Sequence, residues 1–123
     1  MKPGLYLALL SLLLCGPVHA QQYEESTTLL CDTQRQVERY VALFNGDEQS
    51  AIKAVNTEEQ DPTACVLATV AFVRGPELAT ARNEQGEFQI ARILVLGVET
   101  PNGFRPAKPK AFFSAFKVTE YDV

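Results

Sequence analysis

Three closely spaced acids offer the first chemistry that the sequence could support. Glu58, Glu59 and Asp61 lie in the acidic segment TEEQDPT. Paired carboxylates can act as acid and base on a sugar, provided that a cleft holds them at a set separation. Adjacent acids in a loop point into water far more often, and this spacing matches no EF-hand loop for Ca²⁺. We therefore expect a solvated loop and keep a small carboxylate-dependent hydrolase of the cell envelope as the alternative function.

The sequence lacks the residues that nucleophilic catalysis, zinc binding and nucleotide binding need. The single histidine, His19, lies in an N-terminal segment with the features of a signal peptide. Without it, no Ser-His-Asp or Cys-His arrangement can form. The chain has no P-loop, and Gly97 and Gly103 are too isolated for a dinucleotide-binding fingerprint. We expect no catalytic residue, no cofactor and no metal.

A basic and aromatic segment near the C-terminus is the candidate binding element. Residues 105–117 read RPAKPKAFFSAFK, with four bases, three phenylalanines and no acid. Arg105, Lys108, Lys110 and Phe113 could form one exposed surface that holds a protein or an envelope component. Alternatively, the prolines and lysines prevent edge-to-edge pairing, as they do in natural sheets. Edge protection is the favoured interpretation, and the four residues are the candidate ligand-binding site if it fails.

The position of Phe113 distinguishes these alternatives. Successive residues of a strand point to opposite faces, so one face carries Phe112, Ser114, Phe116 and Val118. This face is the better core candidate. Phe113 lies on the other face, where it is either buried under helices or exposed for binding.

Three arginines form a second candidate site, for an anion. Arg74, Arg82 and Arg92 lie on or beside predicted strands. Arg92 and a neighbour could clamp an anion bidentately if both pointed the same way. The favoured alternative is that the arginines pair across the sheet with acids, namely Glu77, Glu84 or Glu87.

The first twenty residues have the features of a secretory signal peptide. An apolar run follows Lys2, and Val18-His19-Ala20 places suitable residues before a cleavage site. We expect cleavage near Ala20 and export, so that the mature protein is either periplasmic or secreted. A lipoprotein signal at Cys15 is the disfavoured alternative, because bulky Leu14 precedes this cysteine. The run is too short to span a bilayer comfortably, and we expect no transmembrane segment in the mature chain.

The expected mature chain keeps two cysteines, Cys31 and Cys65. In an exported protein they should form a disulfide. Charge is unevenly spread, since residues 21–61 hold nine acids and three bases, whereas residues 62–123 hold six acids and seven bases. This acidic balance argues against nucleic acid as a partner, because nucleic-acid binding needs a basic face.

Two helices should position the acidic half of the chain. The first is predicted to start at the capping-box pattern of Thr33 and Gln36, with Asp32 as the other candidate cap. Apolar residues then recur at helical spacing as far as Asn45-Gly46. A second helix should begin at once, with Asp47 as its cap. Its apolar face consists of Ala51, Ile52 and Val55, and we expect Asn56 at its end.

The second half of the chain predicts three or four antiparallel strands. CVLATVAFV, which starts at Cys65, is rich in β-branched residues and should end at Gly75-Pro76. ELATAR could be a short strand, and NEQG is a turn in which Gly86 takes a positive φ. EFQIARILVLGVE changes its alternation, which a β-bulge near Arg92 would explain. AFFSAFKV is the last strand.

These elements predict a single α+β domain over residues 29–123, preceded by a flexible segment over 21–28. The N-terminal helical hairpin would pack on a small antiparallel sheet of three to four strands. An SH3-like small β-barrel with appended helices is the alternative fold. The expected function is an exported, non-enzymatic binding or accessory module with an unknown ligand.

Overall fold

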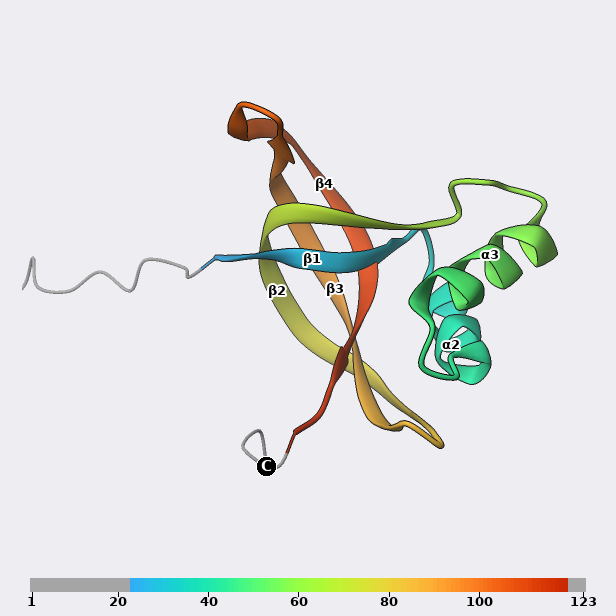
Figure 1. The fold of residues 1–123 in the computed structure, drawn as a ribbon. Helices are drawn as coiled ribbons and strands as arrows, with labels where there is room; N and C mark the ends of the chain where they lie inside the picture. The colour runs from blue at the N-terminus through green and yellow to red at the C-terminus, as the bar shows by residue number, and fades with distance from the viewer. Residues whose placement is uncertain (1–22, 120–123) are drawn as a thin grey trace, which may run out of the picture.

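The chain forms two helices and four antiparallel strands. A computed structural model describes residues 23–119. Its elements are, in chain order, β1 (Glu24–Cys31), α2 (Gln34–Leu43), α3 (Glu48–Glu59), β2 (Cys65–Asn83), β3 (Gly86–Thr100) and β4 (Gly103–Lys117). The strands close a barrel in the order β1-β2-β3-β4, and both helices lie together at one side of it (Figure 1). The α+β class is confirmed, but the expected helix-first order is wrong because β1 precedes the helices.

The expected signal peptide over residues 1–20 and its cleavage after Ala20 lie outside the described residues. Residues 24–28, which we expected to be flexible, form the first five of the eight residues of β1. The strand pairs along its length with β2, from Glu24 opposite Phe72 to Cys31 opposite Cys65. Glu24 is half-buried, the next three polar residues are exposed and the last four residues are buried, so composition alone hid the strand.

Local sequence signals set both helices. At α2, the Thr33 hydroxyl accepts from the backbone N–H of Gln36, and the Gln36 side chain accepts from the backbone N–H of Thr33. The predicted capping box is therefore confirmed, with Thr33 rather than Asp32 as the cap. At α3, the Asp47 carboxylate accepts from the first backbone N–H groups, as predicted.

β2 continues past the Gly75-Pro76 pair that was expected to end it. Arg74 pairs with Ile93 and Glu77 pairs with Ala91, so Gly75 and Pro76 together oppose only Arg92. A side chain at Gly75 would lie 2.6 Å from the Arg92 carbonyl oxygen, which excludes any larger residue. The irregularity expected near Arg92 exists, but the extra residue belongs to the partner strand.

The barrel separates two apolar cores. Between its outer face and the helices lie Leu29, Val37, Tyr40, Val41, Ile52, Val55, Phe88 and Ile90, among others. The opposite, inner face buries Leu30, Val70, Phe72, Ile93 and Val95. β3 contributes to the outer core with its first residues and to the inner core with its later ones. This exchange of buried face explains the changed alternation in its sequence.

The disulfide between Cys31 and Cys65 is formed, as predicted. It joins the end of β1 to the start of β2, where the two Cα atoms lie 4.1 Å apart. The bond thereby closes the chain segment that contains both helices. The helical hairpin is attached to the barrel by a covalent link in addition to its apolar contacts.

Candidate functional site

The four residues of the predicted binding site do not form one surface. Arg105, Lys108 and Lys110 are exposed on β4. Phe113 is half-buried and packs against the core beneath the helices. The Lys110 Nζ lies 4.9 Å from the ring centroid of Phe112, which is the neighbouring phenylalanine on the other face. The basic residues are therefore available to a partner, and Phe113 is a packing residue.

The prolines of β4 lie where they cost the ladder little. Val95 pairs with Lys110 and Gly97 pairs with Pro106, so residues 107–109 form a bulge opposite a single residue of β3. Proline lacks a donor N–H and is tolerated at bulges and on edges. Among residues 23–119, the only registered pair between β4 and β1 is Phe113 with Cys31. This placement supports the edge-protection interpretation.

The three acids do not share one cleft, and each has a structural partner. Glu58 and Glu59 line a hollow of about 290 Å³ between α2 and α3, whereas Asp61 lines the groove between α3 and β2. Glu58 and Glu59 are the last residues of α3, so the expected loop is wrong for both. Arg39 donates to the two carboxylate oxygens of Glu58, each over 2.8 Å. Gln36 donates to Glu59 over 2.8 Å, and Asp61 accepts from the backbone N–H of Thr63.

The lowered pKa of Glu58 also argues against acid–base catalysis by this residue. The hydrogen bond from Arg39 lowers the pKa of the Glu58 carboxyl below its ordinary value. A general acid that works near neutral pH needs the opposite shift, which burial among apolar groups produces. These contacts favour a helix-to-helix tether over acid–base work.

Two of the three arginines are in ion pairs. Arg82 pairs with Glu87, as predicted, over 2.5 Å. Arg74 instead donates to both carboxylate oxygens of Glu24 and stacks its guanidinium 3.6 Å from the Phe116 ring centroid. Arg92 is exposed and forms no ion pair within residues 23–119. Arg74 and Arg92 line the same shallow hollow. An anion clamp would need both to be free, and Arg74 is already paired with Glu24.

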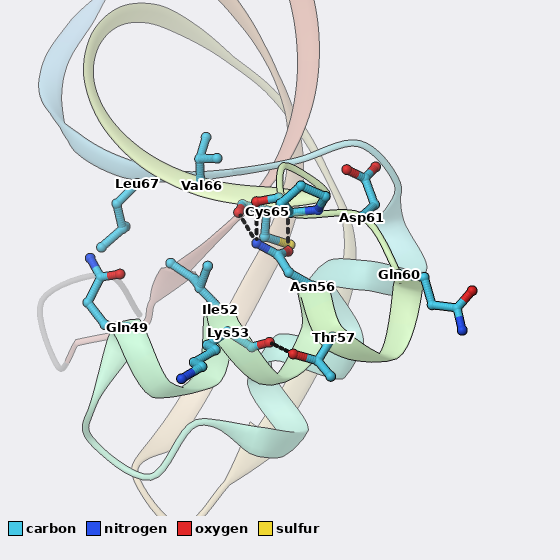
Figure 2. Close-up of a pocket in the computed structure, with 11 residues that line it drawn as sticks. Gln49, Ile52, Lys53, Asn56, Thr57, Gln60, Asp61, Cys65, Val66 and Leu67 are labelled. Atoms are coloured by element: carbon cyan, nitrogen blue, oxygen red, sulfur yellow. Dashed lines mark hydrogen bonds between the residues drawn. The ribbon is translucent and has the colours of Figure 1, made fainter.

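An open groove lies between α3 and the start of β2. Its volume is about 620 Å³. One wall consists of Gln49, Ile52, Lys53, Asn56 and Thr57 of α3 and of its C-cap Gln60. The other wall contains Asp61, Pro62, Cys65, Val66 and Leu67 (Figure 2). A volume of this size lies in the range of ligand-binding clefts.

Asn56 pins one end of this groove. Its amide nitrogen donates to the carbonyl oxygens of Cys65 and Pro62, each over 2.9 Å. Its amide oxygen accepts from the backbone N–H of Cys65 over 2.8 Å. In Figure 2 the side chain points from α3 directly at the Cys65 backbone. Asn56 was expected at a helix end, but it lies within α3, and Gln60 takes the left-handed conformation with φ of 56°.

The Asn56 contact shows which way the β2 backbone faces. In a strand, the N–H and the C=O of one residue point to the same side, and those of the next residue point to the other side. Because the N–H and C=O of Cys65 face α3, those of Leu67 do as well, while Val66 and Ala68 bond to β1. Pairing of β2 with β3 starts only at Val70. Leu67 therefore presents a donor and an acceptor to the groove, and neither has a partner among residues 23–119.

The groove combines apolar and polar walls. Ile52 and Leu67 form its apolar part and belong to the outer core. Gln49 and Lys53 are exposed on the helix, and Lys53 takes part in none of the ion pairs of the described chain. In Figure 2 the Gln49 side chain lies below Leu67, at the end of the groove away from Asn56.

Comparison of the chain with protein-family models, with curated proteins and with solved structures finds no match. Within residues 23–119, no helix is long and apolar enough to cross a membrane. The same residues contain no group of three or more His, Cys, Asp or Glu side chains that could hold a metal ion. Any function must therefore be argued from the geometry of the described surfaces.

Sequence reasoning missed the groove and its central residue. Asn56 lies within α3, one turn after the buried Ile52. Asparagine has a low helix propensity because its amide competes for backbone partners. That mismatch was the available signal that Asn56 bonds to a backbone outside its own helix.

Proposed function

We propose that this protein is an exported, non-enzymatic binding module that holds an extended peptide segment of a partner protein in the groove between α3 and β2. The observation that carries this proposal is that the backbone N–H and C=O of Leu67 are unpaired and face an open groove. Peptide recognition by strand addition uses such an edge, with main-chain hydrogen bonds for affinity and side-chain contacts for specificity.

The chain itself supplies an example of the interaction. The Asn56 amide bonds to both the N–H and the C=O of Cys65, as an added strand would. A peptide residue would make the same two bonds to Leu67, one step further along the same edge. Its side chain would contact the apolar surface of Ile52 and Leu67, while Gln49 and Lys53 would contact its polar groups.

Export is the second part of the proposal. The signal-peptide features of residues 1–20 motivate it, and the disulfide between Cys31 and Cys65 is compatible with an oxidising compartment. A small exported domain without a histidine beyond the signal segment suits binding better than catalysis.

Selection from a library of random displayed peptides tests the binding proposal. The protein without residues 1–20 is immobilised, and enriched peptides are measured by titration. The Gln49→Trp variant places a large side chain in the groove and should weaken binding by about tenfold or more, which corresponds to about 1.4 kcal/mol. Ala42→Trp is the matched control, because Ala42 is exposed on α2 and does not line the groove.

The backbone amide signals of the protein locate the bound peptide. Shifts centred on Leu67 and Lys53, together with weaker binding by Gln49→Trp alone, support the proposal. Equal binding by both tryptophan variants, or shifts confined to another surface, would show that the groove is not the peptide site.

A further inference from the structure

A second exposed surface lies at the end of the barrel that carries the β3–β4 turn. We define the hairpin-end surface by the exposed residues Tyr23, Val98, Phe104, Arg105, Lys108 and Lys110. Tyr23, Phe104 and Arg105 border one hollow, Val98 pairs with Arg105, and Lys108 and Lys110 follow along β4 as far as the pair of Lys110 with Val95. Tyr23 is 62% exposed and Phe104 is 41% exposed, so both aromatic rings are presented to solvent. Two large aromatic side chains exposed together beside cations indicate an interaction surface.

The aromatic rings border a shallow hollow of about 280 Å³. Ala71 and Gly97 are neighbours across β2 and β3, and both line this hollow. A side chain at Gly97 would lie 3.0 Å from the Arg105 carbonyl oxygen, so the close approach of β4 keeps this position small. The hollow is mostly apolar, with Glu25 and Arg105 as its charged residues.

The cations of this surface are not neutralised within the described chain. Arg105, Lys108 and Lys110 take part in none of the ion pairs of residues 23–119. Residues 101–117 contain four bases and no acid, and the nearest acids along the adjoining strands are Glu99 and Glu25.

The rest of the molecule has the opposite charge. Residues 32–61, which include both helices, contain seven acids and three bases. In Figure 1 the β3–β4 turn and the helices lie at different ends of the molecule. A charge distribution of this kind orients a protein at a negatively charged surface, with its acidic end directed away.

We propose that the hairpin-end surface binds the anionic headgroup surface of a phospholipid bilayer. Clustered Lys and Arg residues are attracted to anionic lipids, and aromatic side chains are favoured at the membrane–water interface. Arg105 borders the hollow, and Lys108 and Lys110 are spread along the exposed strand away from it, which suits a dispersed lipid charge better than a single acidic side chain. Tyr23 and Phe104 would enter the headgroup layer, and the chain would lie on the bilayer without crossing it.

Sedimentation with vesicles tests this inference on the chain without residues 1–20. The wild type should bind vesicles that contain phosphatidylglycerol and phosphatidylcholine, and should bind pure phosphatidylcholine much more weakly. The triple variant R105Q/K108Q/K110Q should bind roughly 100-fold more weakly, at roughly fivefold per removed charge. Phe104→Ser should lower the binding that remains at high salt, because it removes an apolar contact and no charge.

The triple variant K53Q/R92Q/K117Q is the matched control. It removes the same total charge from exposed cations outside this surface that take part in no ion pair of residues 23–119. Retained binding by this control, with loss in the hairpin-end triple variant and unchanged melting temperatures, supports the proposal. The hairpin-end triple variant should also keep its affinity for groove peptides, so the two proposals fail independently. Equal loss in both triple variants, absent binding to anionic vesicles, or stronger binding to polyglutamate than to vesicles would overturn the lipid assignment.

Discussion

At the scale of single residues, Asn56 fixes the geometry of the groove through three hydrogen bonds. One side chain joins α3 to Pro62 and to both polar groups of the Cys65 peptide. Asn56 thereby fixes the position of the loop that leads into β2. It also occupies the edge of β2 at Cys65, so the unpaired part of this edge begins after Cys65. Its hydrogen bonds tie sequence-distant backbone groups together in a way that no helical periodicity could report.

Asn56→Ala should lower the free energy of unfolding by about 2 kcal/mol, because it leaves the partly buried polar groups of Cys65 without partners. Urea denaturation measures the change. Thr57→Ala is the control, since the exposed Thr57 hydroxyl bonds only to the Lys53 carbonyl of its own helix, and its loss should cost less than about 0.5 kcal/mol. Equal effects of the two substitutions would refute the pinning role of Asn56.

Glu58 gives a prediction about acid stability. The Arg39 guanidinium lowers the pKa of the Glu58 carboxyl from its ordinary value of 4.5. A lowered native-state pKa means that the stabilisation is present above the unfolded-state value and is lost as the pH falls through the native value. The wild type should therefore lose more stability below about pH 4.5 than Glu58→Gln does. Identical acid limbs in thermal unfolding would rule out this contribution.

At the scale of elements, the local signals were predictable and the non-local pairings were not. The capping box of α2 and the cap of α3 involve residues two or three positions apart, so the sequence displays them directly. β1 depends on pairing with β2, whose residues lie far along the chain, and its polar half looked flexible for that reason. Gly75-Pro76 is a turn signal that the fold uses as a bulge.

The candidate sites divide in the same way. Arg105, Lys108 and Lys110 are exposed, as their charge led us to expect, but Phe113 packs under the helices. The groove was not predictable, because it arises where α3 lies beside the unpaired part of the β2 edge. That juxtaposition follows from the loop geometry that Asn56 enforces.

The link between β1 and β2 supports a prediction about the disulfide. The bond between Cys31 and Cys65 encloses both helices over a sequence separation of 34 residues. Closing a loop of this length restricts the unfolded chain and stabilises the fold by about 3–4 kcal/mol. The double variant C31S/C65S should lose about this much in urea denaturation, as should the reduced wild type. A loss below about 1 kcal/mol in both would show that apolar packing alone holds the helical hairpin in place.

At the scale of the whole molecule, the two proposed surfaces are separate. The groove lies between α3 and β2, on the side that the helices occupy, and the hairpin-end surface lies around the β3–β4 turn (Figure 1). A chain bound to a bilayer through the hairpin end would keep its groove open to a partner. This arrangement suits an accessory protein that presents a partner segment near a membrane surface.

The open edge at Leu67 is the central claim, and amide hydrogen exchange tests it directly. In the free protein, the Val66 and Ala68 amides should be protected by β1, while the Leu67 amide between them should exchange rapidly. A selected groove peptide should slow exchange at Leu67 and leave its two neighbours unchanged. Protection of Leu67 in the free protein, or exchange that the bound peptide does not alter, would contradict strand addition at this site.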